Sequence, residues 1–256
     1  RGDMSFWQKE TERKVWGLIP EVLKVRIISV VRADKVLVLS PHPDDDVMGC
    51  GGLLKMLSDS GAKIKTIYFS DGSRGNRGLK FSQSLIIERE EEARSAGKVL
   101  GVGEEKFLRL PHTKLVANLE LAAQIRREIE FDRPDLLLSP SLEDLHPDHH
   151  AVSEALAISI KNYENSLNIW LYEIWGTGRF NRLVVIDDQI EAKIEALKCH
   201  KTQIKIKSYD QAVVALNNYR ALSVDIGKYA EAYYAIGPRN YKKLFEFYSR
   251  HHESKI

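Results

Sequence analysis

Short apolar runs alternate with amphipathic stretches along most of this chain. An apolar run of about four to eight residues is typical of a strand buried on both faces, whereas apolar residues at every third or fourth position are typical of a helix. The runs predict strands over residues 35–39, 63–69, 106–110, 135–138, 169–174 and 183–186. The amphipathic stretches predict helices over residues 47–58, 84–100, 119–130, 149–161 and 188–200.

This alternation of strands and helices predicts an α/β fold, because parallel neighbouring strands need a crossover helix between them. We expect a doubly wound, mostly parallel, Rossmann-like sheet with helices on both faces. The two ends of the chain add helices to this core. Residues 5–31 predict one or two N-terminal helices broken near Pro20, and residues 212–234 and 240–251 predict closing C-terminal helices.

The chain is expected to form one domain over residues 4–256, because no linker, repeat or low-complexity tract divides it. Residues 1–3, which precede Met4, are interpreted as a remnant of cloning. In α/β sheets of this kind ligands bind beyond the carboxyl ends of the strands, so the residues that follow each strand are the first place to look for chemistry.

Composition and charge exclude several classes of protein. The chain has 256 residues, with 38 Lys and Arg against 36 Asp and Glu. Because the charge is nearly balanced and the basic residues are scattered, we expect no nucleic-acid partner. No apolar run approaches the ~20 residues that cross a bilayer, so no membrane segment is expected. Only two cysteines are present, which fits a reducing compartment, and we expect a cytoplasmic protein.

A cluster of one imidazole and three carboxylates follows the first predicted strand: His42, Asp44, Asp45 and Asp46. Carboxylates crowded in this way repel one another unless a cation or a proton compensates them, and His with Asp is a common ligand set for a divalent transition metal. An acidic helix N-cap is the simpler interpretation, but it accounts for only one of the three carboxylates.

A second such cluster, His146, Asp148 and His149, follows the strand predicted at residues 135–138. Both clusters lie after parallel strands, so they can converge on one metal ion at the same edge of the sheet. A catalytic zinc needs three protein ligands and an open fourth position, and the two clusters contain enough candidates.

The two motifs, HPDDD at residues 42–46 and HPDHH at residues 146–150, resemble those of the PIG-L/LmbE-like zinc-dependent N-deacetylases. The pattern of that family is an (A/P)HPDD(E/D) motif followed by a distal HPDH motif. Weaker matches occur at residues 70–72, 89–101 and 200–203. The resemblance implies one zinc ion per chain, bound by His42, Asp45 and His149.

The resemblance also implies catalytic roles for three residues. Asp44 would be the general base that takes a proton from the attacking water. His146 would stabilise the oxyanion of the tetrahedral intermediate, and Asp148 would orient His146 and raise its pKa. Asp46 stands where the family commonly has Glu, and we assign it no catalytic role.

Two residues are expected to bind substrate. The resemblance makes Arg89 a substrate contact, although a surface salt bridge with Glu88 or Glu92 is an equally good interpretation of an arginine near the start of a helix. His112 stands where the family often has Asp, and it can either hydrogen-bond a substrate hydroxyl or remain a solvated loop histidine.

The resemblance implies removal of the N-acetyl group from an N-acetylglucosamine-containing saccharide. The long segment before His42 favours a resemblance to the diacetylchitobiose deacetylases, so diacetylchitobiose is the preferred substrate. A deacetylase acting on GlcNAc-inositol or GlcNAc-malate in thiol biosynthesis is one alternative. The family resemblance also implies a homo-oligomer, either a trimer or a hexamer.

Two other functions remain open from the residues. The triplet Asp148, His149 and His150 is the signature of DHH-type phosphoesterases, which hold two metal ions. A homologue that binds metal without catalysis is a further possibility, but Asp44 beside the ligands argues against it, since such a protein needs no base.

Overall fold

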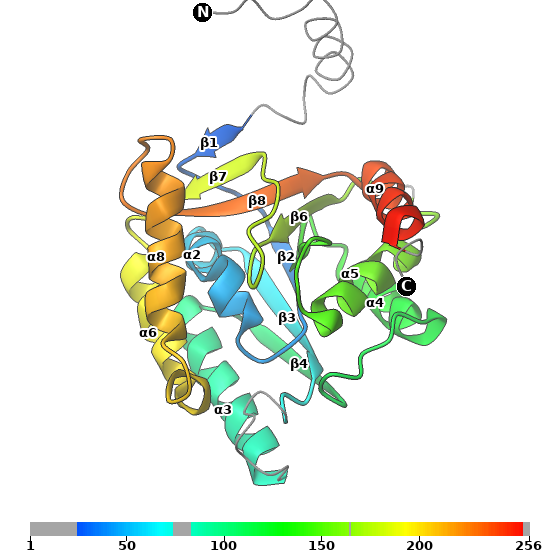
Figure 1. The fold of residues 1–256 in the computed structure, drawn as a ribbon, viewed down its shortest axis with the longest axis horizontal. Coiled ribbons are helices and arrows are strands. Elements are labelled where there is room, and N and C mark those ends of the chain that lie inside the picture. Colours follow the sequence, from blue (N-terminus) through cyan, green and yellow to red (C-terminus); the bar gives the residue numbers. More distant parts are fainter. Residues whose placement is uncertain (1–24, 74–82, 164, 253–256) are drawn as a thin grey trace, which may run out of the picture.

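The computed structural model describes residues 25–73, 83–163 and 165–252 (Figure 1). They contain one eight-stranded sheet with the strand order β1-β7-β8-β6-β5-β2-β3-β4. The strands are β1 (Arg26–Ile28), β2 (Lys35–Ser40), β3 (Lys63–Ser70), β4 (Glu104–Leu110), β5 (Leu136–Pro140), β6 (Asn168–Tyr172), β7 (Arg182–Val185) and β8 (Ala230–Ile236). The prediction for residues 1–3 and most of the predicted N-terminal helical segment lie outside the described residues.

Strands β2 to β6 form the parallel part of the sheet, and side chains from both of its faces are buried. In β2, Val36 and Val38 belong to one apolar cluster, and Leu37 and Leu39 belong to the cluster on the other face. A strand that is apolar at successive positions therefore contributes to two cores at once. This is the doubly wound arrangement that the alternation of elements predicts.

Helices cover both faces of the sheet (Figure 1). Their contacts divide them into two groups. One group consists of α2 (Asp45–Asp59), α3 (Gln83–Leu100), α6 (Ile190–Cys199) and α8 (Tyr209–Leu222), with the short α7 (Lys201–Ile204) before α8. The other group consists of α4 (Leu119–Asp132), α5 (Pro147–Ser159) and α9 (Pro238–His252). No helix in the described parts of the chain is long and apolar enough to cross a membrane.

Glycine lets α2 lie close to the sheet. A Cβ added at Gly49 would lie 2.2 Å from the Tyr172 ring, and one added at Gly52 would lie 2.8 Å from Ile186 side-chain atoms. Distances this short are sterically forbidden, so larger residues would push the helix away from β6 and β7. The position of the helix start, where the first motif lies, depends on this close approach.

Two terminal segments differ from the prediction. The helix predicted over residues 212–234 ends at Leu222, and β8 follows it, antiparallel to both β6 and β7. Asp225 and Gly227 have φ values of 54° and 135°, which a right-handed helix cannot accommodate. Residues 26–28, predicted as helical, instead pair with β7 as an edge strand. The predicted helix over residues 240–251 is confirmed as α9.

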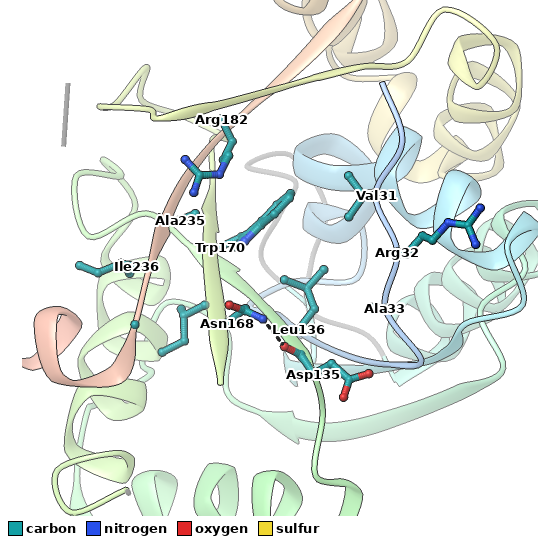
Figure 2. Close-up of a pocket in the computed structure, with 12 residues that line it drawn as sticks. Val31, Arg32, Ala33, Asp135, Leu136, Asn168, Trp170, Arg182, Ala235 and Ile236 are labelled. Carbon is teal, nitrogen blue, oxygen red and sulfur yellow. Dashed lines mark hydrogen bonds between the residues drawn. The ribbon is translucent and has the colours of Figure 1, made fainter. Parts of the chain in front are cut away.

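The two ends of the sheet carry different cavities. A cavity of about 330 Å³ lies at the amino ends of β5 and β6. Asp135, Asn168 and Trp170 are among the residues that line it (Figure 2). A cavity of about 430 Å³ at the opposite, carboxyl ends contains residues of both His/Asp motifs.

Candidate metal centre and active site

The two motifs meet because β2 and β5 are neighbours in the sheet. Val36 pairs with Leu136 and Val38 with Leu138, so both strands end at the same edge. From β2 the chain crosses to β3 on one side, whereas β5 lies on the other side of β2. This reversal of strand order leaves a crevice where α/β sheets bind ligands.

Three ligand-type atoms lie close to one another in this crevice. Nδ1 of His42 is 2.9 Å from Oδ2 of Asp45 and 3.2 Å from Nε2 of His149, and the latter two atoms are 3.1 Å apart. All three residues are buried. In a tetrahedral zinc site with bonds of about 2.0–2.1 Å, ligand atoms are about 3.3 Å apart, so a small expansion would turn this cluster into a three-ligand site.

The other ring nitrogens of the two histidines face carboxylates. Nε2 of His42 lies 3.1 Å from Oδ2 of Asp148, and Nδ1 of His149 lies 3.0 Å from Oδ1 of Asp144. In metalloproteins a ligating histidine usually donates its second N–H to a carboxylate or carbonyl, which fixes the ring and its tautomer. The geometry of both rings therefore fits metal binding through His42 Nδ1 and His149 Nε2.

Asp144 is absent from the set of residues that the sequence predicts. It precedes the second motif by two residues and is fully buried. Its Oδ1 also accepts the backbone N–H of His146, and its Oδ2 accepts that of Trp175. The only signal in the sequence is one more acidic residue in a polar loop, which does not distinguish a ligand partner from a solvated side chain.

The charges of the cluster favour a divalent cation. Burial alone would lower the pKa of His149, but Asp45 and Asp144 outweigh it and raise that pKa to about 10. Burial would also lower the pKa of His42, but Asp45 and Asp148 outweigh it and raise that pKa. At Asp45 burial acts in the opposite direction, and the two histidines outweigh it and lower the pKa of Asp45 well below its usual range. The carboxylates thus favour positive charge between the two imidazoles, and a divalent cation bound there would supply it.

Asp44 lies beside this cluster and is held by Arg89. It is the N-cap residue of α2, but its carboxylate caps no backbone N–H. Instead its Oδ2 lies 3.2 Å from Nη2 of Arg89, and both residues line the cavity. The capping interpretation of this side chain is therefore wrong, which leaves the carboxylate oriented for another role.

Arg89 is fully buried on α3, so its interpretation as a surface salt bridge with Glu88 or Glu92 is wrong. Its Nη1 donates to the carbonyl of Gly72 at 2.6 Å. Gly72 has φ of 63°, and a Cβ there would lie 2.5 Å from the guanidinium, so glycine is required for this contact. A role in substrate binding stays a prediction.

His146 is the N-cap residue of α5, where its Nδ1 accepts the backbone N–H of Asp148. This contact places the proton of a neutral ring on Nε2. Burial, together with the charges of His42 and His149, lowers the pKa of His146, although Asp148 acts in the opposite direction. The carboxylate of Asp148 itself accepts hydrogen bonds from His42 and from the backbone of Thr113 and Leu115, not from His146.

The two residues that depart from the family pattern are both buried. The ring of His112 packs against that of His42 with a centroid separation of 4.4 Å, so it is not a solvated loop histidine. Burial, helped by His42 and Arg89, lowers its pKa to about 3. Asp46 lies away from the cavity and accepts the Tyr68 hydroxyl at 2.8 Å. Burial raises the pKa of Asp46 to about 7.

The cavity joins the metal cluster to an outer rim. Its volume of about 430 Å³ lies in the usual range for small-molecule sites, about 300–1,000 Å³. The side chains that line it come from both motifs, from α3, from the segments after β4 and β6, and from α7, the start of α8 and the loop between them. They are His42, Asp44, Asp45, Arg89, His112, Thr113, Leu145, His146, Trp175, Gln203, Ile206, Lys207 and Tyr209.

Comparison with known proteins gives concordant results. The profile of the family described as PIG-L: GlcNAc-PI de-N-acetylase matches residues 37–159. A diacetylchitobiose deacetylase of Thermococcus kodakarensis is 31% identical over 186 residues, which are 66% of this chain and 70% of that protein. A probable N-acetyl-alpha-D-glucosaminyl L-malate deacetylase 2 of Bacillus cereus is 24% identical over 70% of this chain and 92% of its own.

The fold is also that of a solved relative. The structure of N,N'-diacetylchitobiose deacetylase from Pyrococcus horikoshii superimposes with a TM-score of 0.74, at 24% identity, over 94% of this chain and 96% of the other. The comparisons do not support the alternative of a DHH-type phosphoesterase. Both His/Asp motifs lie within residues 37–159. The chain is a member of the PIG-L de-N-acetylase family.

Proposed function

We propose that this protein is a zinc-dependent deacetylase that hydrolyses the N-acetyl group of an N-acetylglucosamine-containing saccharide, releasing acetate and a free amine. The observation that carries the proposal is the cluster of His42, Asp45 and His149, with ligand atoms 2.9–3.2 Å apart, opening into a cavity that also holds Asp44. The deacetylases among its relatives support the same reaction class.

The metal is assigned to the three clustered residues. His42 would bind it through Nδ1, Asp45 through Oδ2 and His149 through Nε2. A divalent metal bound there supplies a Lewis acid that activates water and polarises the amide carbonyl. Two nitrogens and one carboxylate oxygen, all buried, suit zinc, and one ion per chain is expected.

Asp44 is assigned the proton transfers. Its carboxylate faces the cavity next to Asp45, and the ion pair with Arg89 fixes its orientation. A carboxylate in this position accepts a proton from the attacking water and delivers it to the leaving nitrogen, which must be protonated to depart as an amine.

His146 is assigned the stabilisation of the oxyanion. The contact between its Nδ1 and the backbone of Asp148 leaves Nε2–H as the donor of a neutral ring. A neutral imidazole at a helix N-terminus donates a hydrogen bond to developing negative charge without needing its own proton transfer. This assignment refines the role that the resemblance implies, in which Asp148 raises the pKa of the ring.

The proposal is tested by measuring metal content and acetate release on the same preparation. We expect about one zinc per chain and acetate released from N-acetylglucosamine, from diacetylchitobiose or from both. Chelator-treated protein should lose turnover, and added zinc should restore it, which controls for contaminating hydrolases. Metal-loaded protein that releases no acetate from any N-acetylglucosamine conjugate, including GlcNAc-malate and GlcNAc-inositol, would disprove the proposed function.

The oligomeric state also stays a prediction. The trimer or hexamer that the family resemblance implies is tested by analytical ultracentrifugation of the metal-loaded protein. A monomer at micromolar concentration would contradict it without affecting the assignment of the metal centre.

A further inference from the structure

The cavity at the amino ends of the strands lies at the other end of the sheet from the metal cluster, and the proposed deacetylation does not use it. Its volume of about 330 Å³ is within the usual range for small-molecule sites. One wall is the connection between β1 and β2, which contributes Val31, Arg32 and Ala33. Because β7, β8, β6 and β5 lie between those two strands in the sheet, this connection must pass four strands, and the cavity lies between it and their residues.

The sheet presents an indole and a guanidinium on one face in this cavity. Trp170 pairs with Ala235 and Arg182 pairs with Tyr233. Residues two apart on a strand share a face, and so do cross-strand partners, so Trp170 and Arg182 lie on the same face. In the view of Figure 2 the Trp170 indole lies between Arg182 and Val31. The ring of Trp170 also contacts that of Tyr233, with centroids 5.4 Å apart, which fixes its position.

The charge of Arg182 is not neutralised by a carboxylate in the described part of the chain. Its Nη1 donates to the backbone carbonyl of Asn181 at 2.8 Å. Its register partner on β1 is Arg26, so two like charges stand opposite each other on neighbouring strands, an arrangement that destabilises a sheet. Burial and the charge of Arg26 both lower the pKa of Arg182. An anion bound beside Arg182 would relieve this repulsion.

The carboxylate that lines the cavity is engaged by the backbone. Oδ2 of Asp135 accepts the N–H of Asp34 at 2.8 Å and that of Lys35 at 2.9 Å. Arg32 is a second cation in the lining, and no described carboxylate forms an ion pair with it. Together with Arg26 next to Arg182, these side chains leave an excess of positive charge at this end of the sheet.

We propose that this cavity binds a phosphate ester, with its phosphate on Arg182 and its ring on Trp170. A guanidinium forms paired hydrogen bonds with two phosphate oxygens, and Arg26 and Arg32 add to the attraction. The face of an indole packs against a nucleobase or a sugar ring, so both a nucleoside monophosphate and a sugar phosphate have the required chemistry. The site is separate from the metal cluster, so the proposal does not depend on the proposed function.

Isothermal titration calorimetry of the metal-loaded protein tests the proposal with AMP, glucose 6-phosphate and inorganic phosphate. At least one of the two esters should bind with a dissociation constant below about 1 mM, and more tightly than inorganic phosphate. The ester that binds more tightly identifies the ring. Adenosine and glucose lack the phosphate and are the neutral controls, which should bind at least about tenfold more weakly than the corresponding ester.

Matched variants locate the phosphate. Arg182→Gln should weaken binding of the ester by about 10–100-fold, because it removes hydrogen bonds to a charged group. Arg179→Gln also removes one positive charge, but Arg179 is exposed, pairs with Glu143 and does not line the cavity, so binding should not change. Asn168→Asp places a carboxylate in the lining at an exposed position and should weaken binding without disturbing the core.

Two further variants locate the ring and exclude the metal. The tryptophan fluorescence change on binding should disappear in Trp170→Phe, which keeps an aromatic ring and most of the affinity. It should persist in Trp175→Phe, since Trp175 lines the cavity of the metal cluster. His149→Ala, expected to lose its metal, should bind the ester as the wild type does, whether or not the protein releases acetate.

Four outcomes would overturn the proposal. The first is the absence of binding of either ester at millimolar concentration. The second is equally tight binding of inorganic phosphate or of the neutral controls, which would leave the ring or the phosphate without a role. The third is unchanged affinity in both Arg182→Gln and Asn168→Asp. The fourth is loss of binding in His149→Ala, which would place the phosphate on the metal.

Discussion

Two groups of buried side chains in this molecule each combine a carboxylate with basic residues. They differ in how the hydrogen bonds of their polar atoms are satisfied. In the core, Glu231 on β8 faces Lys193 on α6, and both side chains are fully buried. Oε1 of Glu231 accepts from Gly52 N at 2.8 Å and from Lys193 Nζ at 2.6 Å. Oε2 accepts from Leu53 N at 2.8 Å and from the Tyr233 hydroxyl at 2.6 Å.

The cluster of His42, Asp45 and His149 is equally buried, but the chain does not supply a full set of hydrogen-bond donors to its polar atoms. Each carboxylate oxygen of Glu231 has two donors from the chain. In contrast, His42 Nδ1, Asp45 Oδ2 and His149 Nε2 all face the same point. All three are acceptors once the rings are neutral, so they need protons or a cation between them.

The difference separates a structural charge from a functional one. Burying a charge costs several kcal/mol unless its hydrogen bonds are complete, and the Glu231 group meets that condition using the chain alone. The cluster at the carboxyl ends of β2 and β5 meets it only with added protons or an added cation. Substitutions should therefore reveal opposite phenotypes: loss of stability in the first group, and loss of metal or turnover in the second.

The largest effect is expected for His149→Ala, which removes one of the three proposed metal ligands. Metal content should fall from about one ion per chain to near zero, and turnover should be lost with it. Inductively coupled plasma mass spectrometry of the dialysed protein measures the first effect. His200→Ala is the control, because His200 is buried but lies outside the cluster. Full metal content in His149→Ala would contradict the ligand assignment.

The next largest effect is expected for Asp44→Asn, which removes the proposed base and not a ligand. We expect kcat to fall about 10²–10⁴-fold while the metal content stays at the wild-type level. Asparagine retains an oxygen that can accept from Arg89, so the ion pair is replaced by a hydrogen bond. Loss of metal in this variant, or turnover within a few-fold of wild type, would overturn the role of Asp44.

The sequence predicts that His42, Asp45 and His149 converge because the determinants of their positions are local. His42 and Asp45 are three residues apart in one turn, and parallel strands bring that turn next to the loop that contains His149. Motif spacing and strand order therefore suffice to place the ligand atoms together. The same reasoning predicts the parallel part of the sheet, where apolar strands alternate with helices.

The sequence does not predict the partners of the cluster, because they depend on local backbone turns and on the packing of segments against one another. The contact of Asp144 with His149 depends on the backbone turn between the two residues, and no spacing rule predicts that turn. Arg89 was assigned to substrate or to a neighbouring glutamate, and its pairing with Asp44 arises only when α3 packs against α2. The pattern of apolar residues in β8 is compatible with a helix, and the left-handed turn at Asp225 and Gly227 decides against it.

The Glu231 group supplies the next prediction, since disruption there should affect folding. Lys193→Met leaves a buried carboxylate without its counterion and should lower the free energy of unfolding by about 3–5 kcal/mol. Urea denaturation measures this change. Replacing both partners, in Lys193→Met with Glu231→Leu, should recover much of the loss, because a pair of apolar side chains leaves no charge unpaired. The folded fraction of Lys193→Met should bind metal as the wild type does.

The smallest effect, and the one that most sharply distinguishes the two groups, is expected for Asp144→Asn. The carboxylate contacts His149 and the backbone of His146 and Trp175, but none of the ligand atoms that face the metal position. Loss of such a partner usually weakens metal affinity by about 10–100-fold. Competition with a chromophoric chelator measures this change, and Asp148→Asn, which alters the equivalent contact to His42, provides the matched comparison. If Asp144 instead behaved like Glu231, the variant would lose stability in the metal-free protein and keep its metal affinity. The two measurements together therefore determine whether the carboxylates behind the histidines serve the metal or the fold.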